Sequence, residues 1–219
     1  LAACSIFESD GDEEELGPVE LVDFNEEVSI KKLWSRRVTS GQGEFQRVQM
    51  QKTDDVIYVA GYEGDIAAVA SGNGEVIWSE NYDLPIAGGV GVGVGKIYVG
   101  TTDGEVIAIS SHDGDLLWKV SVQGEVLSAP QGNGTVVAVQ SYDGKLHGLN
   151  AVDGKNIWTF DSNVPVLTLR GTSSPIFYGD VVLAGFGNGK VAAFDSKSGT
   201  LRWETRVAIS QGRSEIERI

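Results

Sequence analysis

The segment Lys96–Val122 reads KIYVGTTDGEVIAISSHDGDLLWKVSV, and three further segments of the chain align with it without a gap. These are Val56–Tyr82 (VIYVAGYEGDIAAVASGNGEVIWSENY), Val136–Ser162 (VVAVQSYDGKLHGLNAVDGKNIWTFDS) and Val181–Val207 (VVLAGFGNGKVAAFDSKSGTLRWETRV). The four copies start at positions 56, 96, 136 and 181. Self-similarity at a period of this length is the signature of a repeat architecture, so this repeat decides the fold.

Three columns of the repeat keep one type of residue in all four copies. The first column holds a tryptophan, at Trp78, Trp118, Trp158 and Trp203. The second holds a glycine, at Gly74, Gly114, Gly154 and Gly199. The third holds a small residue, at Ala68, Ala108, Gly148 and Ala193. We expect each indole to pack between neighbouring units, where the small residue leaves room for it, rather than to stack on a ligand.

Each unit reads as short strands separated by turns. Val56–Val59 is an apolar, β-branched run, and Ile66–Ala70 and Glu75–Glu80 form two further strands on either side of the Asn73-Gly74 hairpin turn. The linking segment Gly124–Gln131 supplies a fourth strand. Four antiparallel strands in about 40 residues, repeated, predict an all-β propeller of four-stranded blades. The Gly-His and Trp-Asp signatures of WD40 blades are missing, and the pattern is typical of the quinoprotein-type repeat.

The number of repeats predicts an incomplete ring. We place a partial propeller in residues 31–219, with one lone strand near Trp34 and blades around 56–82, 96–122, 136–162 and 181–207. A lone strand of this kind commonly completes the last blade of a closed propeller, so we expect about half of an eight-bladed ring. Open sheet faces and edges would favour self-association of two such chains. A self-contained ring of four blades is the alternative.

Charge and composition exclude several classes of function. The chain has 219 residues, with 17 basic and 31 acidic side chains and a net charge of −14. This balance argues against nucleic acid as the main partner, because phosphate binding needs a basic face. One cysteine and two histidines exclude an internal disulfide and most transition-metal sites. We therefore expect no cofactor and no metal.

The N-terminal region reads as a lipid anchor followed by a tether. Leu1-Ala2-Ala3-Cys4-Ser5 is similar to a bacterial lipobox, so residues 1–3 are expected to be the remnant of a signal peptide and Cys4 the acylated residue, carrying palmitate or a similar chain. Ser5 after the cysteine is typical of lipoproteins sent to the outer membrane. Ten carboxylates and no basic residue lie between Ser5 and Ile30. Residues 4–30 are thus expected to be a lipidated cysteine with an acidic tether.

Candidate catalytic residues are few. His112 and His147 fall in different columns of the repeat, and neither has a carboxylate at metal-ligand spacing, so we interpret both as ordinary structural or surface residues. The glycine-rich run Gly88–Gly95 resembles a phosphate loop, but no helix follows it. We expect a flexible, glycine-rich edge strand there. No catalytic residue is predicted.

The repeat breaks its own spacing between Phe160 and Ser173, where five extra residues are present. This connection contains Leu167 and Leu169 beside Arg170. Apolar anchors next to an arginine are the usual composition of a protein-binding hot spot. We expect these three residues to bind a partner protein; the alternative is a longer loop whose leucines fold back onto the blade.

These features together resemble the BamB family, the lipoprotein subunits of the outer-membrane β-barrel assembly (Bam) machine of Gram-negative bacteria. The resemblance rests on the lipobox-like start, the quinoprotein-type repeats, the LTLRGTSSP segment at 167–175 and the SEIER segment at 214–218. It implies an eight-bladed propeller without enzymatic activity, on the periplasmic face of the outer membrane. It also implies a scaffold that binds periplasmic domains of the barrel-forming subunit BamA and assists the insertion of barrel proteins. The family's contact motif corresponds to Leu167, Leu169 and Arg170.

Two other functions remain open at the level of sequence. A quinoprotein dehydrogenase dependent on pyrroloquinoline quinone shares the repeat, and fold alone does not decide function. Such an enzyme needs a bound calcium ion and an acidic base, and no matching constellation is apparent. A generic periplasmic propeller that binds another protein is the second alternative. Exposed blade edges would also suit unfolded outer-membrane proteins, held by β-augmentation.

Overall fold

The computed structural model describes residues 27–41, 49–162 and 172–208. The chain divides into a short unit, Leu1–Lys32, and a body, Leu33–Ile219. All of the strands described belong to the body, and they form four separate antiparallel sheets of four strands each. Within the described ranges, no helix has the length and apolar character needed to cross a membrane.

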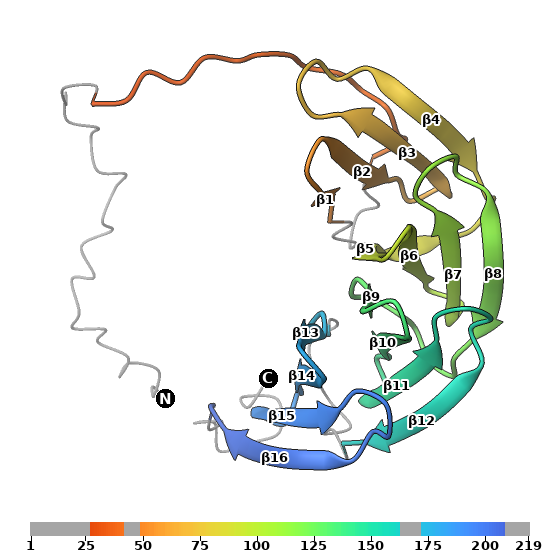
Figure 1. Ribbon diagram of the computed structural model, residues 1–219, viewed down its shortest axis with the longest axis vertical. Coiled ribbons are helices and arrows are strands. Elements are labelled where there is room, and N and C mark those ends of the chain that lie inside the picture. Colours follow the sequence, from red (N-terminus) through yellow and green to blue (C-terminus); the bar gives the residue numbers. More distant parts are fainter. Residues whose placement is uncertain (1–26, 42–48, 163–171, 209–219) are drawn as a thin grey trace, which may run out of the picture. The chain divides into compact units, whose positions relative to one another are not determined.

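Each sheet is one blade, with its strands side by side in chain order (Figure 1). Blade 1 consists of β1 (Gln51–Lys52), β2 (Val56–Ala60), β3 (Asp65–Ala70) and β4 (Val76–Asn81). Blade 2 consists of β5 (Ile86–Gly93), β6 (Lys96–Thr101), β7 (Glu105–Ser110) and β8 (Leu116–Ser121). Blade 3 consists of β9 (Gln131–Gly132), β10 (Val136–Gln140), β11 (Lys145–Asn150) and β12 (Asn156–Asp161). Blade 4 consists of β13 (Ile176–Tyr178), β14 (Val181–Gly185), β15 (Lys190–Asp195) and β16 (Leu201–Arg206).

The turn before each outer strand follows from its sequence. Gly74 has a φ of 71°, in the left-handed region that glycine adopts without steric cost. The side chain of Asn73 accepts a hydrogen bond from the backbone N–H of Glu75 at 3.0 Å, which is the local Asx turn that asparagine and aspartate favour. Asp113 and Asp153 repeat this contact in blades 2 and 3. In blade 4 the hydroxyl of Ser198 accepts from the N–H of Thr200 at 3.3 Å, and Gly199 has a φ of 70°, so a serine takes the place of the Asn or Asp side chain there.

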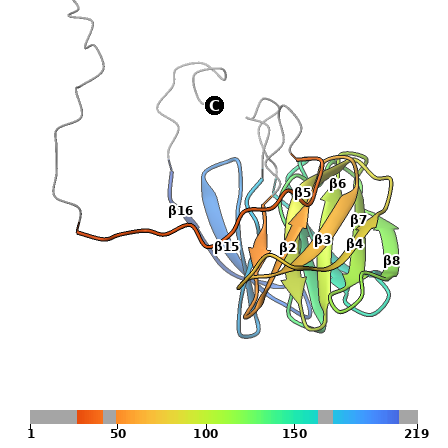
Figure 2. The ribbon, with the colours of Figure 1, turned by 90° about the horizontal axis from the view of Figure 1, so that it is seen from above.

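The hydrophobic core consists of three clusters, each shared by two consecutive blades. Strand β6 shows how a blade contributes to both of its neighbours, because Ile97 and Val99 join the cluster with blade 1 whereas Tyr98 joins the cluster with blade 3. Alternate side chains of a strand point to opposite faces of its sheet. The sheets of blades 1 and 2 accordingly lie face to face (Figure 2).

The prediction of a lone strand near Trp34 is not met. Leu33–Ser35 belongs to no strand, because no strand of the described residues offers it a backbone ladder. The indole of Trp34 nevertheless donates a hydrogen bond to the carbonyl of Ser71 at 2.9 Å. The residue thus contacts blade 1 through its side chain rather than through a sheet.

The glycine-rich run is an edge strand, but a buried one. Strand β5 is the first strand of its sheet and lies on the inner side of the blade (Figure 1), and residues 86–91 are fully buried. A Cβ added at Gly91 would lie 1.4 Å from the carbonyl oxygen of Pro130, and one at Gly88 would lie 2.6 Å from that of Ser128. The glycines are therefore required by close backbone approach from blade 3, not by flexibility. The fourth strand expected over Gly124–Gln131 is present only as the short β9.

Candidate partner-binding site

The repeated tryptophans join each blade to the next through one recurring contact, which we call the tryptophan lock. In each lock an indole N–H of one blade donates to a carbonyl in the following blade. The pairs are Trp78 to Ser111 at 3.1 Å, Trp118 to Ala151 at 3.2 Å and Trp158 to Ser196 at 2.9 Å. The ring then covers the turn glycine of that blade, so that an added Cβ would lie within 3 Å of it at Gly114, Gly154 and Gly199.

Trp34 makes the same contact on blade 1, over Gly74. Three of the blade tryptophans are only 8% exposed, whereas Trp203 is 49% exposed. The locked indoles have both their N–H group and one ring face engaged by protein. They are therefore structural groups and offer no stacking platform for a ligand.

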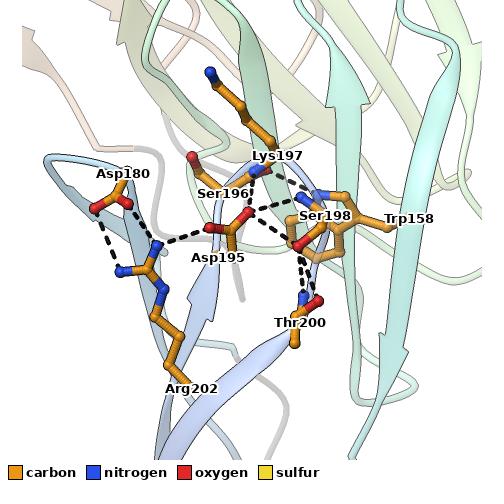
Figure 3. A network of polar contacts seen from close by, with 8 residues as sticks. All are labelled: Trp158, Asp180, Asp195, Ser196, Lys197, Ser198, Thr200 and Arg202. Atoms are coloured by element: carbon orange, nitrogen blue, oxygen red, sulfur yellow. Dashed lines mark hydrogen bonds and ion pairs between the residues drawn. The ribbon is translucent and has the colours of Figure 1, made fainter.

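The lock between blades 3 and 4 is surrounded by a polar network (Figure 3). The Asp195 carboxylate accepts hydrogen bonds from the backbone N–H groups of Lys197 and Ser198 at 3.2 and 3.0 Å. Arg202 donates to Asp180 at 2.5 Å and to Asp195 at 2.7 Å. Hydrogen bonding by Arg202, with that of Ser198, holds the pKa of Asp195 far below its ordinary value. This carboxylate stays charged and engaged in the turn, so it is not a candidate for acid–base catalysis.

His147 lies in a hydrogen-bonded chain that does not suit nucleophilic catalysis. Its Nε2 lies 3.2 Å from the Ser141 hydroxyl and its Nδ1 lies 3.2 Å from the Thr159 hydroxyl. The Ser141 hydroxyl donates to Asp143 at 2.5 Å, so the acid contacts the serine and not the histidine. Burial lowers the pKa of His147. A catalytic triad needs the acid to orient the histidine and an accessible serine, and Ser141 is fully buried.

The other residues considered from the sequence carry no such site either. His112 is exposed. In residues 27–41, 49–162 and 172–208, no three His, Cys, Asp or Glu side chains gather as metal ligands would. Cys4 and the segment with Leu167, Leu169 and Arg170 lie outside the described residues. What the structure does describe is the surface from which this segment leaves and to which it returns.

A cavity of about 880 Å³ lies beside the point where the segment returns. Residues of blades 2, 3 and 4 line it, among them Ser128, Gln140, Thr172, Ser173 and Phe186. The hydroxyls of Ser128 and Thr172 are buried and have no hydrogen-bond partner in the described part of the chain. Buried polar atoms normally have a partner. The cavity next to the predicted binding segment therefore has both polar residues and the aromatic residue Phe186 in its lining.

Both ends of this segment are held by side chains that sequence reasoning missed. Ser173 is hydrogen-bonded to Gln140, and Ser162 to Asn188. One signal was available in the sequence, because Gln140 stands in a column that otherwise holds Ala60, Gly100 and Gly185. A long polar side chain in a column of small residues marks a position with a local role.

Comparison with known proteins agrees with this architecture. A family model described as "Outer membrane protein assembly factor BamB" matches residues 62–219. The proteins of that name from Pseudomonas aeruginosa and Escherichia coli are 50% and 34% identical, each over the whole of this chain and 58% of their own length. The chain thus spans little more than half the length of these relatives.

Solved structures give the same result for the fold. The crystal structure of BamB from Moraxella catarrhalis matches 80% of this chain and 53% of its own, with a TM-score of 0.73 and 26% identity. A quinohemoprotein alcohol dehydrogenase from Comamonas testosteroni matches 76% of the chain with a TM-score of 0.59 and 17% identity, which shows the shared propeller fold alone. The four blades, about half of a ring, and the family match along the repeats lead to one assignment: the chain belongs to the BamB family of outer membrane protein assembly factors.

Proposed function

We propose that the protein is a non-enzymatic scaffold subunit of the Bam complex, which binds BamA and assists the insertion of β-barrel proteins into the outer membrane. The observation that carries this proposal is the 50% identity, over the whole chain, to an outer membrane protein assembly factor. Since the chain spans 58% of that relative, the partner and the activity of the whole protein are part of the proposal. The dehydrogenase alternative is not favoured, because its support is a shared fold at 17% identity.

The binding site we propose is the connection between blades 3 and 4. Leu167 and Leu169 would fill an apolar groove of BamA, and Arg170 would pair with a carboxylate or carbonyl of the partner. Arginine beside apolar anchors is characteristic of interface hot spots, because its planar guanidinium forms several directed hydrogen bonds. The five extra residues of this connection support the proposal, since the repeat itself has no use for them.

The location we propose is the inner leaflet of the outer membrane. Acyl chains on Cys4 would anchor the protein, and the acidic residues 5–30 would give the propeller reach from the membrane surface. One acyl chain binds a membrane only marginally, so stable anchoring needs more than one. Replacement of Cys4 with alanine, followed by fractionation of membranes, tests this part of the proposal independently of partner binding.

The binding proposal is tested with the Arg170→Glu variant and the periplasmic domains of BamA. Reversal of charge at a hot-spot residue should weaken the complex by about 30-fold or more, which corresponds to about 2 kcal/mol. Arg206→Glu is the matched control, because Arg206 is an exposed arginine of β16. Equal dissociation constants for Arg170→Glu and the unaltered chain would exclude Arg170 as the anchor.

A further inference from the structure

The connection between blades 3 and 4 is held at both ends by side chains of the opposite blade. It leaves blade 3 at Ser162, directly after β12, and enters blade 4 at Ser173, shortly before β13. Ser162 is bound by a residue of blade 4, and Ser173 by a residue of blade 3. We call these two contacts together the double clasp.

The clasp at Ser173 is the more extensive of the two. Gln140, only 2% exposed, lies at the end of β10 and donates from Nε2 to the carbonyl of Gly185 at 2.8 Å. The Ser173 hydroxyl lies 2.9 Å from Oε1 of Gln140 and 2.9 Å from the Gly185 carbonyl, and it accepts the N–H of Gly185 at 3.0 Å. Ser173 is therefore held by backbone and side chain at once, and Gln140 links blade 3 to blade 4.

The clasp at Ser162 uses a turn residue of blade 4. The Nδ2 of Asn188 donates to the carbonyl of Ser162 at 3.0 Å and lies 3.2 Å from its hydroxyl. The Oδ1 of Asn188 accepts the N–H of Lys190 at 3.2 Å, so the amide is fixed in orientation by its own turn. The contact is thus directed, and it ties the last described residue before the connection to the next blade.

Neither clasp can be formed in the same way at the other blade junctions. The column of Gln140 holds only alanine or glycine elsewhere, at Ala60, Gly100 and Gly185. The column of Asn188 holds acidic residues, which cannot donate a side-chain hydrogen bond when ionised, at Glu63, Asp103 and Asp143. Ser128 is the counterpart of Ser173 at the junction of blades 2 and 3. The Gln140 column holds Gly100 there, which has no side chain to bind it, and the hydroxyl of Ser128 has no partner in the described residues. The double clasp occurs where the repeat is lengthened.

We propose that the double clasp positions the binding segment, with Gln140, Ser173 and Asn188 as positioning residues for Leu167, Leu169 and Arg170. This inference rests on the proposed function. Fixing both ends of a connection lowers the entropy that it loses on binding. When only a fraction of the molecules is competent to bind, the apparent dissociation constant rises in inverse proportion to that fraction. Loss of a clasp should therefore slow association while the contacts in the complex stay the same.

The test uses Gln140→Ala, Ser173→Ala and Asn188→Ala in the full chain. Alanine at 140 is compatible with the blade, since Ala60 stands in that column. Each variant should bind the periplasmic domains of BamA about 2- to 10-fold more weakly, the equivalent of one net hydrogen bond. The association rate constant should fall by this factor, and the dissociation rate constant should stay the same. Glu63→Ala and Asp103→Ala, at the counterparts of Asn188 in blades 1 and 2, are the column-matched controls and should bind like the unaltered chain.

A second readout needs no partner. Trypsin cleaves after Arg170, and mass spectrometry of the fragments reports this cleavage separately from the others. The clasp variants should be cleaved there faster than the controls, at an unchanged melting temperature. Equal cleavage in variants and controls would overturn the clasp, and faster cleavage with unchanged association would overturn its role in binding. Failure of the unaltered chain to bind would refute the proposed function, while the cleavage rates would still decide whether the clasp exists.

Discussion

Replacing Gly148 with alanine should destabilise the body, although alanine occupies the same column in the three other blades. A Cβ at Gly148 would lie 2.1 Å from Cε2 and 2.3 Å from Nε1 of Trp158. Both distances are far below van der Waals contact, and the neighbour is a bulky ring that lies between two blades. The ring cannot yield without disturbing its lock on Ser196.

Trp158 comes this close to Gly148 because blade 3 also lacks the tyrosine that contacts the tryptophan in blades 1 and 2. In blades 1 and 2 the tryptophan of the fourth strand lies against a tyrosine of the second strand of the same blade. The ring centroids are 6.2 Å apart for Tyr58 and Trp78 and 5.9 Å apart for Tyr98 and Trp118. Blade 3 has Ala138 in the tyrosine column. Trp158 there stacks on Phe194 of blade 4 at 6.3 Å and fills the space above Gly148.

Two opposing effects set the magnitude. Glycine inside a strand is less favourable than alanine by about 0.5–1 kcal/mol, because a glycine chain loses more conformational entropy on folding. This effect alone would raise the free energy of unfolding of the alanine variant by that amount. Overpacking of a filled core costs about 1–3 kcal/mol. The expected net result is a loss of about 1 kcal/mol in the free energy of unfolding, which lowers the melting temperature by about 2–4 °C for a body of this size.

The assay is urea denaturation followed by far-ultraviolet circular dichroism, which does not depend on indole fluorescence. The same substitution is measured in a Trp158→Phe background, where the smaller ring should remove the clash and leave alanine neutral or stabilising. The two substitutions should therefore be coupled in a double-mutant cycle. A Gly148→Ala protein as stable as the unaltered chain would refute this account of the junction.

Two further predictions concern His147 and the locks. Because burial lowers the pKa of His147, the unfolded chain takes up its proton first as the pH falls below about 6.5, and stability is lost in that direction. Alanine is tolerated at this position of the repeat, since Ala67 and Ala192 stand in the same column. His147→Ala should therefore reduce the slope of the free energy of unfolding against pH. An unchanged slope would contradict a lowered pKa of His147 in the folded protein. Trp118→Phe removes the hydrogen bond to Ala151 and should cost about 1–3 kcal/mol in the same denaturation assay. Trp203→Phe, at an indole that is 49% exposed, should cost clearly less, and equal losses would argue against the lock.

Much of the fold could be predicted because it depends on local rules repeated four times. Apolar alternation, an Asx–glycine turn and a fixed tryptophan column each act within about 40 residues, so four copies support one another. The strand near Trp34 could not be judged in this way. A strand exists only with a hydrogen-bonding neighbour, and a short apolar sequence does not say whether one is available.

The double clasp could not be predicted for a different reason. Gln140 and Ser173 are 33 positions apart, and their contact depends on how two blades are placed relative to each other. The burial of β5 is a similar case, since Pro130 and Ser128 approach it from another blade. Repeat alignment marks such positions as exceptions but gives no distance between them.

The tryptophan lock has a polarity. In each of the four described locks the indole reaches forward along the chain, to the blade that follows it, and none of these locks reaches back. A module that emerges from the ribosome or from a translocation channel before its successor therefore leaves its indole and one face of its sheet uncovered, because each core cluster is shared by two consecutive blades. The successor covers that face and supplies the carbonyl that the indole needs, so neighbouring modules stabilise each other wherever folding begins.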